Sequence, residues 1–294
     1  MLRTQHDPQR PGTGSSNARE TGSRQAGQNC VLVNPRSFRL RDRKRLDQIR
    51  AAAAAGQAPV HVVHRPEQIA AALASETSST LRRLIIIGGD GTVQAALSTL
   101  ADDSPETRPE ILALGGGRTN FTARDMGTHG TPVALLEAAL HKPEAFGIEE
   151  RAVLTIEQAA TQTRMHGLFL AAALVDHVIR DCHQYRAHHH GWLRTGHPSS
   201  FWRVLQLAAS GSLRRSAYPA PNMCINAEHL GQLDQPIRLL MTSTLHHQRG
   251  PINPYADRGM GPVRLTAISD RAKGFWQSLP GLLRGRLHDS KNPS

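Results

Sequence analysis

The chain has 294 residues, of which 39% are hydrophobic and 20% charged, and its formal net charge is +11 at pH 7. This composition predicts a folded protein of about two domains and excludes collagen-like, coiled-coil and acidic classes. Cys30, Cys182 and Cys224 have no CxxC spacing, so we expect no disulfide framework, no zinc motif and a cytoplasmic location. The longest apolar run, 168–175, is far shorter than the roughly 20 residues of a membrane span.

Basic residues are concentrated near the two ends of the chain. Residues 1–28, rich in Gly, Ser, Gln, Arg and Pro, predict a disordered basic tail. Arginines cluster over 39–50, and basic residues also exceed acidic ones over 271–294. Such a surface attracts anions, which include nucleotides, anionic lipid head groups and nucleic acid, or it is simply a solvated face.

The first half of the chain alternates short apolar runs with helical segments. The runs 30–33, 60–63, 84–87 and 111–114 predict strands, and the segments 38–55, 66–75 and 93–100 predict helices. We expect Ser37 to cap the first helix and Gly56 to end it. The alternation predicts an α/β fold with a doubly wound, mostly parallel sheet, whose ligand lies at the carboxyl ends of the strands. Three loops meet there: 34–37, 88–92 and 115–120.

The second of these loops has the composition of a phosphate-binding turn. It reads Gly88-Gly89-Asp90-Gly91-Thr92 and joins a strand to a helix. Glycines let backbone N–H groups approach a polyphosphate without obstruction by a Cβ atom. A carboxylate beside phosphates needs a cation between them, so Asp90 suggests Mg²⁺. The turn is neither a P-loop nor a Rossmann fingerprint, and a merely tight strand–helix connection is the alternative.

This turn resembles the nucleotide-binding signature of the diacylglycerol kinase catalytic-domain superfamily, which includes bacterial lipid kinases and sphingosine kinases. Two further segments fit in the same order. Residues 31–37, Val-Leu-Val-Asn-Pro-Arg-Ser, resemble the opening strand of that family and its Asn-Pro-x-Ser-Gly turn. Residues 117–127 resemble its Gly-Thr-Gly-Asn-Asp-Phe-Ala-Arg-x-Leu-Gly segment. The resemblance is strong over about 30–140.

The resemblance implies an ATP-dependent lipid kinase that uses Mg²⁺, with Asp90 holding the metal indirectly and serving as the candidate catalytic residue. It also implies nucleotide-binding roles for a set of loop residues: Asn34, Pro35, Arg36, Ser37, Arg65, Gly88, Gly89, Asp90, Gly91, Thr92, Gly117, Arg118, Thr119 and Asn120. Three positions depart from the family pattern. Phe38 stands where the family has Gly, and Arg118 and Arg65 stand where it has Thr, although guanidinium groups also bind phosphate.

The second half of the chain shows short β-like stretches at 152–157, 165–174, 220–226, 237–245 and 262–267, with a helix expected over 201–207. We therefore expect a nucleotide-binding α/β kinase domain over 29–147 and a smaller, mainly antiparallel domain over 148–267. The resemblance implies that the latter is a β-sandwich forming the lipid side. A C-terminal helix and tail over 268–294 would return to the first domain or dock on a membrane. The histidines at 188–190 and 246–247 are expected in polar loops.

One family element has no counterpart. Members of the family usually carry a later Asp-Gly-Glu segment, whose Glu acts as general base on the lipid hydroxyl, and this sequence contains none. We expect either a relative shortened at its C-terminus or a different carboxylate in that role. A nucleotide- or lipid-binding pseudokinase therefore remains open, as does an NAD kinase, which shares the GGDG turn. The expected partners are a nucleotide and a lipid at an anionic membrane surface, whereas no nucleic acid is expected. The sequence leaves the oligomeric state open.

Overall fold

The computed structural model describes residues 27–76, 81–101, 103, 107–158, 161–178, 180, 219–227, 231–245, 255 and 261–272. The tail over 1–26, the helices expected at 201–207 and in the C-terminal segment, and the histidine runs lie outside these residues. The chain divides into two compact units. The first unit comprises the described residues up to 150 together with 155–167, and the second comprises 151–154 and the described residues from 168 onward.

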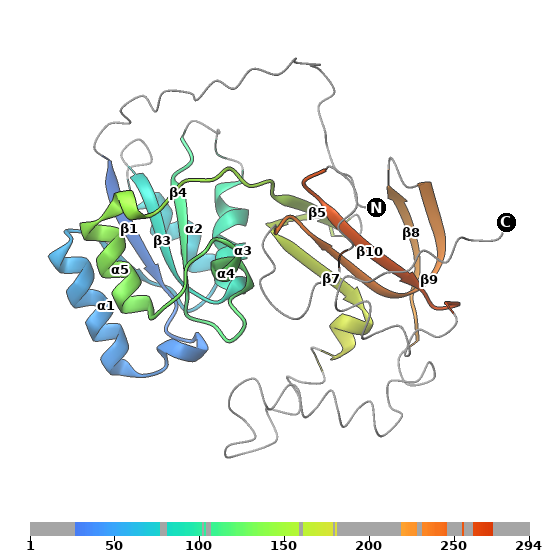
Figure 1. Cartoon of the computed structure of the whole chain (residues 1–294), viewed down its shortest axis with the longest axis horizontal. Helices are drawn as coiled ribbons and strands as arrows, with labels where there is room; N and C mark the ends of the chain where they lie inside the picture. The colour runs from blue at the N-terminus through green and yellow to red at the C-terminus, as the bar shows by residue number, and fades with distance from the viewer. Residues whose placement is uncertain are drawn as a thin grey trace. The chain divides into compact units, whose positions relative to one another are not determined.

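The first unit is built on a parallel sheet (Figure 1). Its strands are β1 (Gln28–Val33), β2 (Val60–Val62), β3 (Leu81–Gly88) and β4 (Glu110–Gly115), in the order β2-β1-β3-β4. The predicted doubly wound parallel sheet is confirmed. The chain leaves β1 toward β2 and then crosses back to β3, so the order reverses between β1 and β3. Ligands bind at such a switch point, outside the carboxyl ends of the strands.

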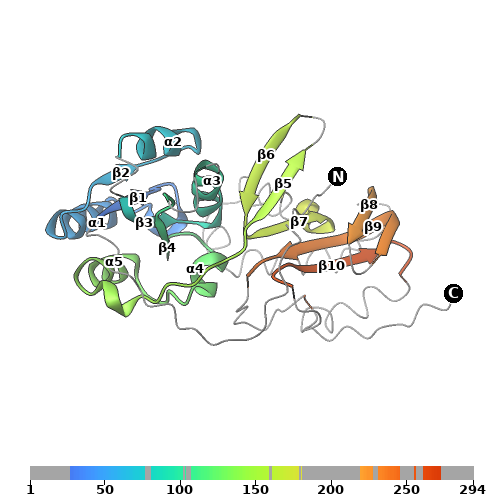
Figure 2. The same ribbon diagram turned by 90° about the horizontal axis from the view of Figure 1, so that it is seen from above.

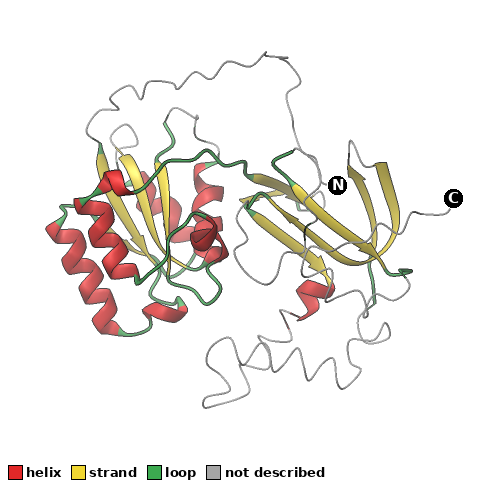
Figure 3. Cartoon of the chain, viewed as in Figure 1, coloured by secondary structure: helices red, strands yellow, loops and turns green. Residues whose placement is uncertain are grey.

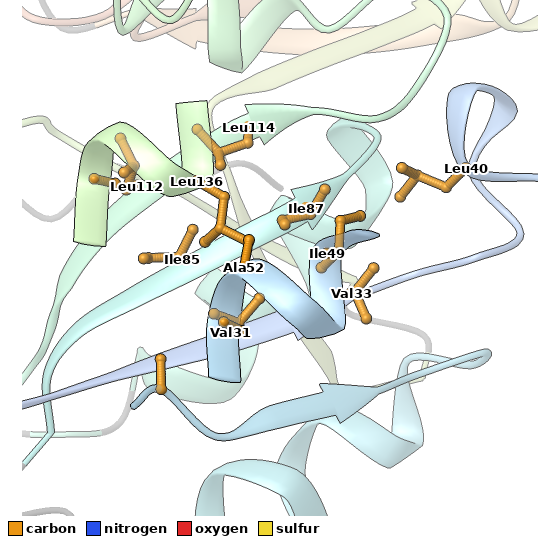
Figure 4. Packing of buried hydrophobic residues seen from close by; sticks show 13 residues of the cluster. Val31, Val33, Leu40, Ile49, Ala52, Ile85, Ile87, Leu112, Leu114 and Leu136 are labelled. Atoms are coloured by element: carbon orange, nitrogen blue, oxygen red, sulfur yellow. The ribbon is translucent and has the colours of Figure 1, made fainter. Parts of the chain in front are cut away.

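Helices cover both faces of this sheet (Figure 2). Two of them, α1 (Arg43–Ala55) and α5 (Pro132–His141), pack on one face against alternate strand residues such as Val31, Ile85 and Leu114 (Figure 4). The opposite face receives α2 (Glu67–Ala74), α3 (Asp90–Leu100) and α4 (Phe121–Asp125). The central strand β3 is fully buried from residue 84 to residue 87 because its side chains alternate between the two cores.

The predicted helix over 38–55 is wrong at its beginning. A short 3₁₀ turn, η1 (Phe38–Leu40), comes first, and α1 begins only at Arg43. The side chain of Ser37 makes no capping hydrogen bond, whereas the Asp42 carboxylate accepts one from the Lys44 N–H (3.0 Å). A carboxylate at the N-cap satisfies a free helical N–H and favours the positive end of the helix. Gly56 ends α1 as expected.

The first unit also contains η2 (Pro143–Ala145), β6 (Thr163–Gly167) and, except for Leu154, its partner strand β5 (Leu154–Gln158). Residues of β6 contact α3. Both backbone groups of His166 bond to Ser98 of α3: its N–H donates to the Ser98 hydroxyl oxygen (2.9 Å), and its carbonyl accepts from that hydroxyl (3.1 Å). These bonds attach the strand pair to the C-terminal part of α3.

The second unit is antiparallel in its described part (Figure 3). The long strand β9 (Gly231–Ser243) pairs with β7 (Phe169–Ala173), β8 (Asn222–Ala227) and β10 (Arg264–Ser269). The single β-like stretch expected over 165–174 is wrong, since β6 ends at Gly167 and β7 begins at Phe169. The Leu168 carbonyl at this break accepts bonds from the Ser243 hydroxyl and the Thr244 N–H (both 3.0 Å).

Among the described helices, none has the length and apolar character needed to cross a bilayer.

The core around β3 generates a stability prediction. Ile86 is fully buried, so Ile86→Ala should lower the free energy of unfolding by about 2–5 kcal/mol through lost burial and the cavity left behind. Ile148, 65% exposed, offers the matched substitution Ile148→Ala, which should cost less than about 0.5 kcal/mol. Urea unfolding followed by circular dichroism measures both. Equal losses in the two variants would contradict the assignment of Ile86 to the core.

Candidate nucleotide-binding site

Backbone hydrogen bonds join the three loops at the carboxyl ends of the strands. The Asn34 N–H donates to the carbonyl of Ile87 (3.0 Å), which links the ends of β1 and β3. The Gly88 carbonyl accepts from the N–H groups of Gly116 (2.7 Å) and Gly117 (3.2 Å), which links the loops after β3 and β4. The Arg39 N–H donates to the Gly116 carbonyl (2.9 Å), which links the segment after β1 to the loop after β4.

Several glycines in these loops are required by the packing itself. A Cβ on Gly117 would lie 2.7 Å from the Cα of Gly89, and a Cβ on Gly116 would lie 3.2 Å from the Cα of Gly88. A Cβ on Gly88 would in turn lie 2.7 Å from the Cβ of Thr92. The Cα atoms of Gly88 and Gly89 belong to the backbone, so they cannot move away from an added Cβ as the end of a flexible side chain could. The loops after β3 and β4 therefore touch through their backbones, and only glycine permits that approach.

Asn34 fixes the first loop. Its side-chain carbonyl accepts a hydrogen bond from the Arg36 N–H (3.0 Å), which forms a local turn around Pro35. Its side-chain amide donates to the hydroxyl oxygen of Thr92 (3.0 Å) and so ties the loop after β1 to the first turn of α3. The Ser37 N–H donates to the Asn34 carbonyl (3.0 Å). Asn34 is thus a positioning residue for both loops.

Asn120 has the same kind of role in the third loop. Its backbone is left-handed, with φ of 52°, and its side chain is buried. The side-chain carbonyl accepts from the Gly117 N–H (2.7 Å), while the side-chain amide donates to the Gly117 carbonyl (3.0 Å). Asparagine is one of the few residues that tolerate this conformation. Its side chain therefore holds the loop in shape instead of reaching toward a ligand.

The Asp90 carboxylate bonds to the third loop and the start of α4. Its Oδ1 accepts from the Thr122 N–H in the first turn of α4 (2.9 Å), and its Oδ2 accepts from the Thr119 hydroxyl at 3.4 Å. Because the side chain of Asn120 is bonded to Gly117, Asp90 supplies the capping acceptor that α4 needs. An ionised carboxylate has about four acceptor positions, so these two bonds leave room for further contacts.

A cavity of about 300 Å³ lies against the loops after β1, β2 and β3. It brings together six of the predicted residues: Asn34, Ser37, Arg65, Gly89, Gly91 and Thr92. The remaining predicted residues lie outside its lining: Pro35, Arg36, Gly88, Asp90, Gly117, Arg118, Thr119 and Asn120. Most of these shape the loops behind the cavity, as the hydrogen bonds above show.

Five lining residues escaped the sequence-based prediction: Val63, His64, Pro66, Ile69 and Ala95. They form a wall from the end of β2 and from α2 and α3. No motif marks them, and the usable signal is their position directly after the second predicted strand. The Gln68 side chain organises this wall by accepting from the N–H groups of His64 (2.6 Å) and Arg65 (3.1 Å).

Gly91 differs from the other glycines of the site. It is exposed, lines the cavity, and belongs to the first turn of α3. A Cβ at this position would meet nothing within 4 Å. Its φ is not in the left-handed region that favours glycine. Alanine would stabilise a helix at this position, so neither packing nor backbone conformation explains the glycine.

Cationic side chains border the loops. Arg65 lines the cavity, and no residue that the structure describes bonds to its guanidinium group. Arg36 reaches across to the His64 carbonyl (3.4 Å). Arg118 lies over the ring of Phe38, with 4.1 Å between the guanidinium carbon and the ring centre. Phe38 and Arg118 are two of the positions that depart from the family pattern, and here they form one cation–π pair.

Residues 28–147 match the family model described as the diacylglycerol kinase catalytic domain, which confirms the resemblance seen in the sequence. Three solved structures from Bacillus anthracis str. Sterne, described as diacylglycerol kinases (provisionally so in two), are each 17% identical to this chain. Their TM-scores are 0.52, 0.52 and 0.53, and the matches cover 88%, 90% and 89% of this chain and 80%, 80% and 82% of theirs. At this identity the likeness concerns the fold. A search of curated proteins gave no match.

The contact between the glycine loops can be tested by adding one methyl group. Gly117→Ala should lower the free energy of unfolding by roughly 1–3 kcal/mol, because its Cβ meets the Cα of Gly89. Gly147→Ala serves as the matched control, since a Cβ there meets nothing within 4 Å. Urea titration of the two variants beside the wild type gives the comparison. Unchanged stability of the Gly117 variant would show that the loops do not pack as described.

Proposed function

We propose that the first unit binds ATP with Mg²⁺ in the cavity at the ends of β1, β2 and β3, and that the protein transfers the γ-phosphoryl group to a lipid hydroxyl, as in diacylglycerol or a sphingoid base. The family match over 28–147 supports a kinase of the lipid-kinase type. The family match does not identify the nucleotide, the metal or the lipid acceptor, and these three assignments are part of our proposal.

Gly91 is the observation that carries the nucleotide assignment. Its environment has room for a side chain, its backbone does not require glycine, and it faces the cavity. A ligand that lies directly on the backbone explains why a side chain is disfavoured there. The ligand in question is anionic, because the N-terminus of α3 presents free N–H groups and the positive end of the helix dipole at this point.

The surroundings of α3 supply further phosphate-binding groups. The Thr92 hydroxyl accepts a bond from the Asn34 amide and can therefore direct its own hydrogen toward the cavity. Ser37 and Arg65 also line the cavity, and their hydroxyl and guanidinium groups are potential phosphate ligands. A guanidinium fork matches the geometry of a phosphate in a way that a Thr hydroxyl does not. In this proposal Arg65 replaces the hydroxyl contact that the family often makes at this position.

Asp90 fits the role of an indirect Mg²⁺ ligand. It lies beside the phosphate turn, it is only partly buried, and it keeps acceptor positions beyond its bonds to Thr119 and Thr122. Mg²⁺ retains several waters in protein sites, so a carboxylate can hold it through water. The ion would neutralise phosphate charge, while Asp90 also keeps α4 in place. Phosphoryl transfer depends mainly on such positioning and electrostatic stabilisation.

The lipid side of the reaction is assigned to the domain proposed over 148–267. Its strands β7 to β10 form the antiparallel sheets that the second unit contributes. The net charge of +11 favours attachment to an anionic membrane surface, with the protein cytoplasmic and peripheral. We propose that the acceptor hydroxyl is presented at such a surface.

The central test measures transfer of ³²P from γ-labelled ATP into a mixed lipid extract with Mg²⁺. The wild-type protein should label lipid, whereas Asp90→Asn should reduce the rate at least about 100-fold, because the charge that holds the cation is lost. The Asn oxygen can still accept a hydrogen bond from the Thr122 N–H, so the free energy of unfolding should change by only about 1 kcal/mol. Asp47→Asn, an exposed change on α1, is the control and should keep full activity.

Other outcomes of this assay point to the alternatives. Measurable ATP binding without transfer by the wild type would identify a binding protein of the same fold and overturn the kinase assignment. Label in NAD added to the same mixture, and not in lipid, would identify an NAD kinase.

Gly91→Ala separates binding from folding. We expect the Kd for ATP to rise about tenfold or more, which corresponds to about 1.4 kcal/mol, because the added methyl group occupies the ligand's position. The free energy of unfolding should stay the same or rise by about 0.5–1 kcal/mol, because alanine is a better helix former than glycine. Calorimetric titration and urea unfolding give the two quantities. Unchanged ATP affinity would remove the reason for placing the phosphates on Gly91.

A further inference from the structure

A cluster of potential metal ligands lies apart from the nucleotide loops. Cys30 of β1, His61 of β2 and Glu76 after the C-terminus of α2 place one sulfur, one ring nitrogen and one carboxylate oxygen within 4.8 Å of one another. Cys30 belongs to the beginning of β1, whereas the nucleotide loops follow the ends of the strands. Figure 2 shows α2 beside β1 and β2. We propose that these three residues bind a zinc ion.

The fold brings these residues together although 31 and 15 positions separate them in the sequence. Parallel pairing sets Leu32 opposite His61, so His61 shares a sheet face with Leu32 and Cys30, two residues apart on β1. The crossover through α2 then returns the chain toward the beginning of β3, and Glu76 in this connection lies near Cys30 and His61. No local spacing motif marks such a site.

The donor set matches zinc better than the cations that use oxygen ligands alone. Thiolate and imidazole together favour Zn²⁺, and a water can complete the tetrahedral shell. The thiolate and the carboxylate carry two negative charges, which balance the charge of Zn²⁺, so the complex is neutral in a largely buried place. Cys30 is fully buried, while the side chains of His61 and Glu76 are 24% and 14% exposed. This partial exposure leaves room for ion entry and for the water.

The geometry needs only small side-chain movements. Ligand atoms in a tetrahedral zinc site are roughly 3.4–3.6 Å apart. The His61 Nε2 and a Glu76 carboxylate oxygen are 2.5 Å apart, joined by a hydrogen bond. Zinc would replace this bond, so that Nε2 binds the metal and the ring proton moves to Nδ1. The Cys30 thiol proton leaves to solvent as the zinc–sulfur bond forms, and no electron is transferred.

Without a cation the thiol is unreactive. Burial, and secondarily the charge of Glu76, raises the pKa of Cys30 to about 12, so the sulfur is not a free thiolate nucleophile. A divalent cation reverses this preference, because thiols that coordinate metals are deprotonated.

The test uses the full-length protein freed of metal by a chelator and titrated with Co²⁺ as a spectroscopic probe for the zinc site. The wild type should show a sulfur-to-cobalt charge-transfer band and tetrahedral d–d bands at one ion per chain, and Zn²⁺ should displace them. Cys30→Ser should abolish the charge-transfer band. The double variant Cys182→Ser/Cys224→Ser should keep it, which assigns the sulfur.

Glu76→Gln provides a second variant, because it preserves the shape of the side chain if Cys30→Ser fails to fold. It should weaken Zn²⁺ binding at least about 100-fold, since even outer-shell partners change metal affinity 10- to 100-fold. At the same concentration, Zn²⁺ should also raise the melting temperature of the wild type more than that of Glu76→Gln. The proposal fails if the wild type gives no charge-transfer band, or if the double cysteine variant loses it. It also fails if Glu76→Gln binds Zn²⁺ as tightly as the wild type.

Discussion

The candidate site depends on one backbone contact, the approach of the loop after β3 to the loop after β4. The Gly88 carbonyl accepts two N–H groups from the neighbouring loop, and the Cα of Gly89 packs against Gly117. Side chains at these positions would force the loops apart. This separation would displace α3 and α4, because each of these helices begins directly after one of the loops. The position of the N–H groups at the start of α3 therefore follows from two adjoining glycine turns.

The most polar side chains of the loops serve the loops themselves. The side-chain amides of Asn34 and Asn120 form hydrogen bonds with backbone and hydroxyl groups of the loops, and Asp90 caps α4. The residues that line the cavity include Gly91, which has no packing role, together with Ser37, Thr92 and Arg65. The loop backbone is held in place by these bonds, so the backbone N–H groups need little reordering to bind the anion that we propose.

The alternation of apolar runs was enough to predict the parallel sheet and the three loops, because buried parallel strands are continuously apolar. It could not predict that the helix expected from residue 38 begins only at Arg43, since that depends on Asp42 as a cap and on the Arg39 bond to Gly116. The hydrogen bond from the Thr122 N–H of α4 to the Asp90 carboxylate could not be predicted from the sequence either. The Arg39–Gly116 bond and the Asp90–Thr122 bond each join segments that are distant in sequence, whereas the Asp42 cap is a local contact. The assignment of site residues to a nucleotide stays a prediction.

Phe38 and Arg118 show why the departures from the family pattern should be considered together. In the sequence they are two separate losses, a glycine from the first loop and a hydroxyl from the third. In the structure the guanidinium group of one lies over the ring of the other. A pair of this kind contributes about 0.5–2 kcal/mol, and the ring restricts where the positive charge can lie. The pair holds the positive charge of Arg118 beside the glycine loops, next to the cavity where we propose that an anion binds.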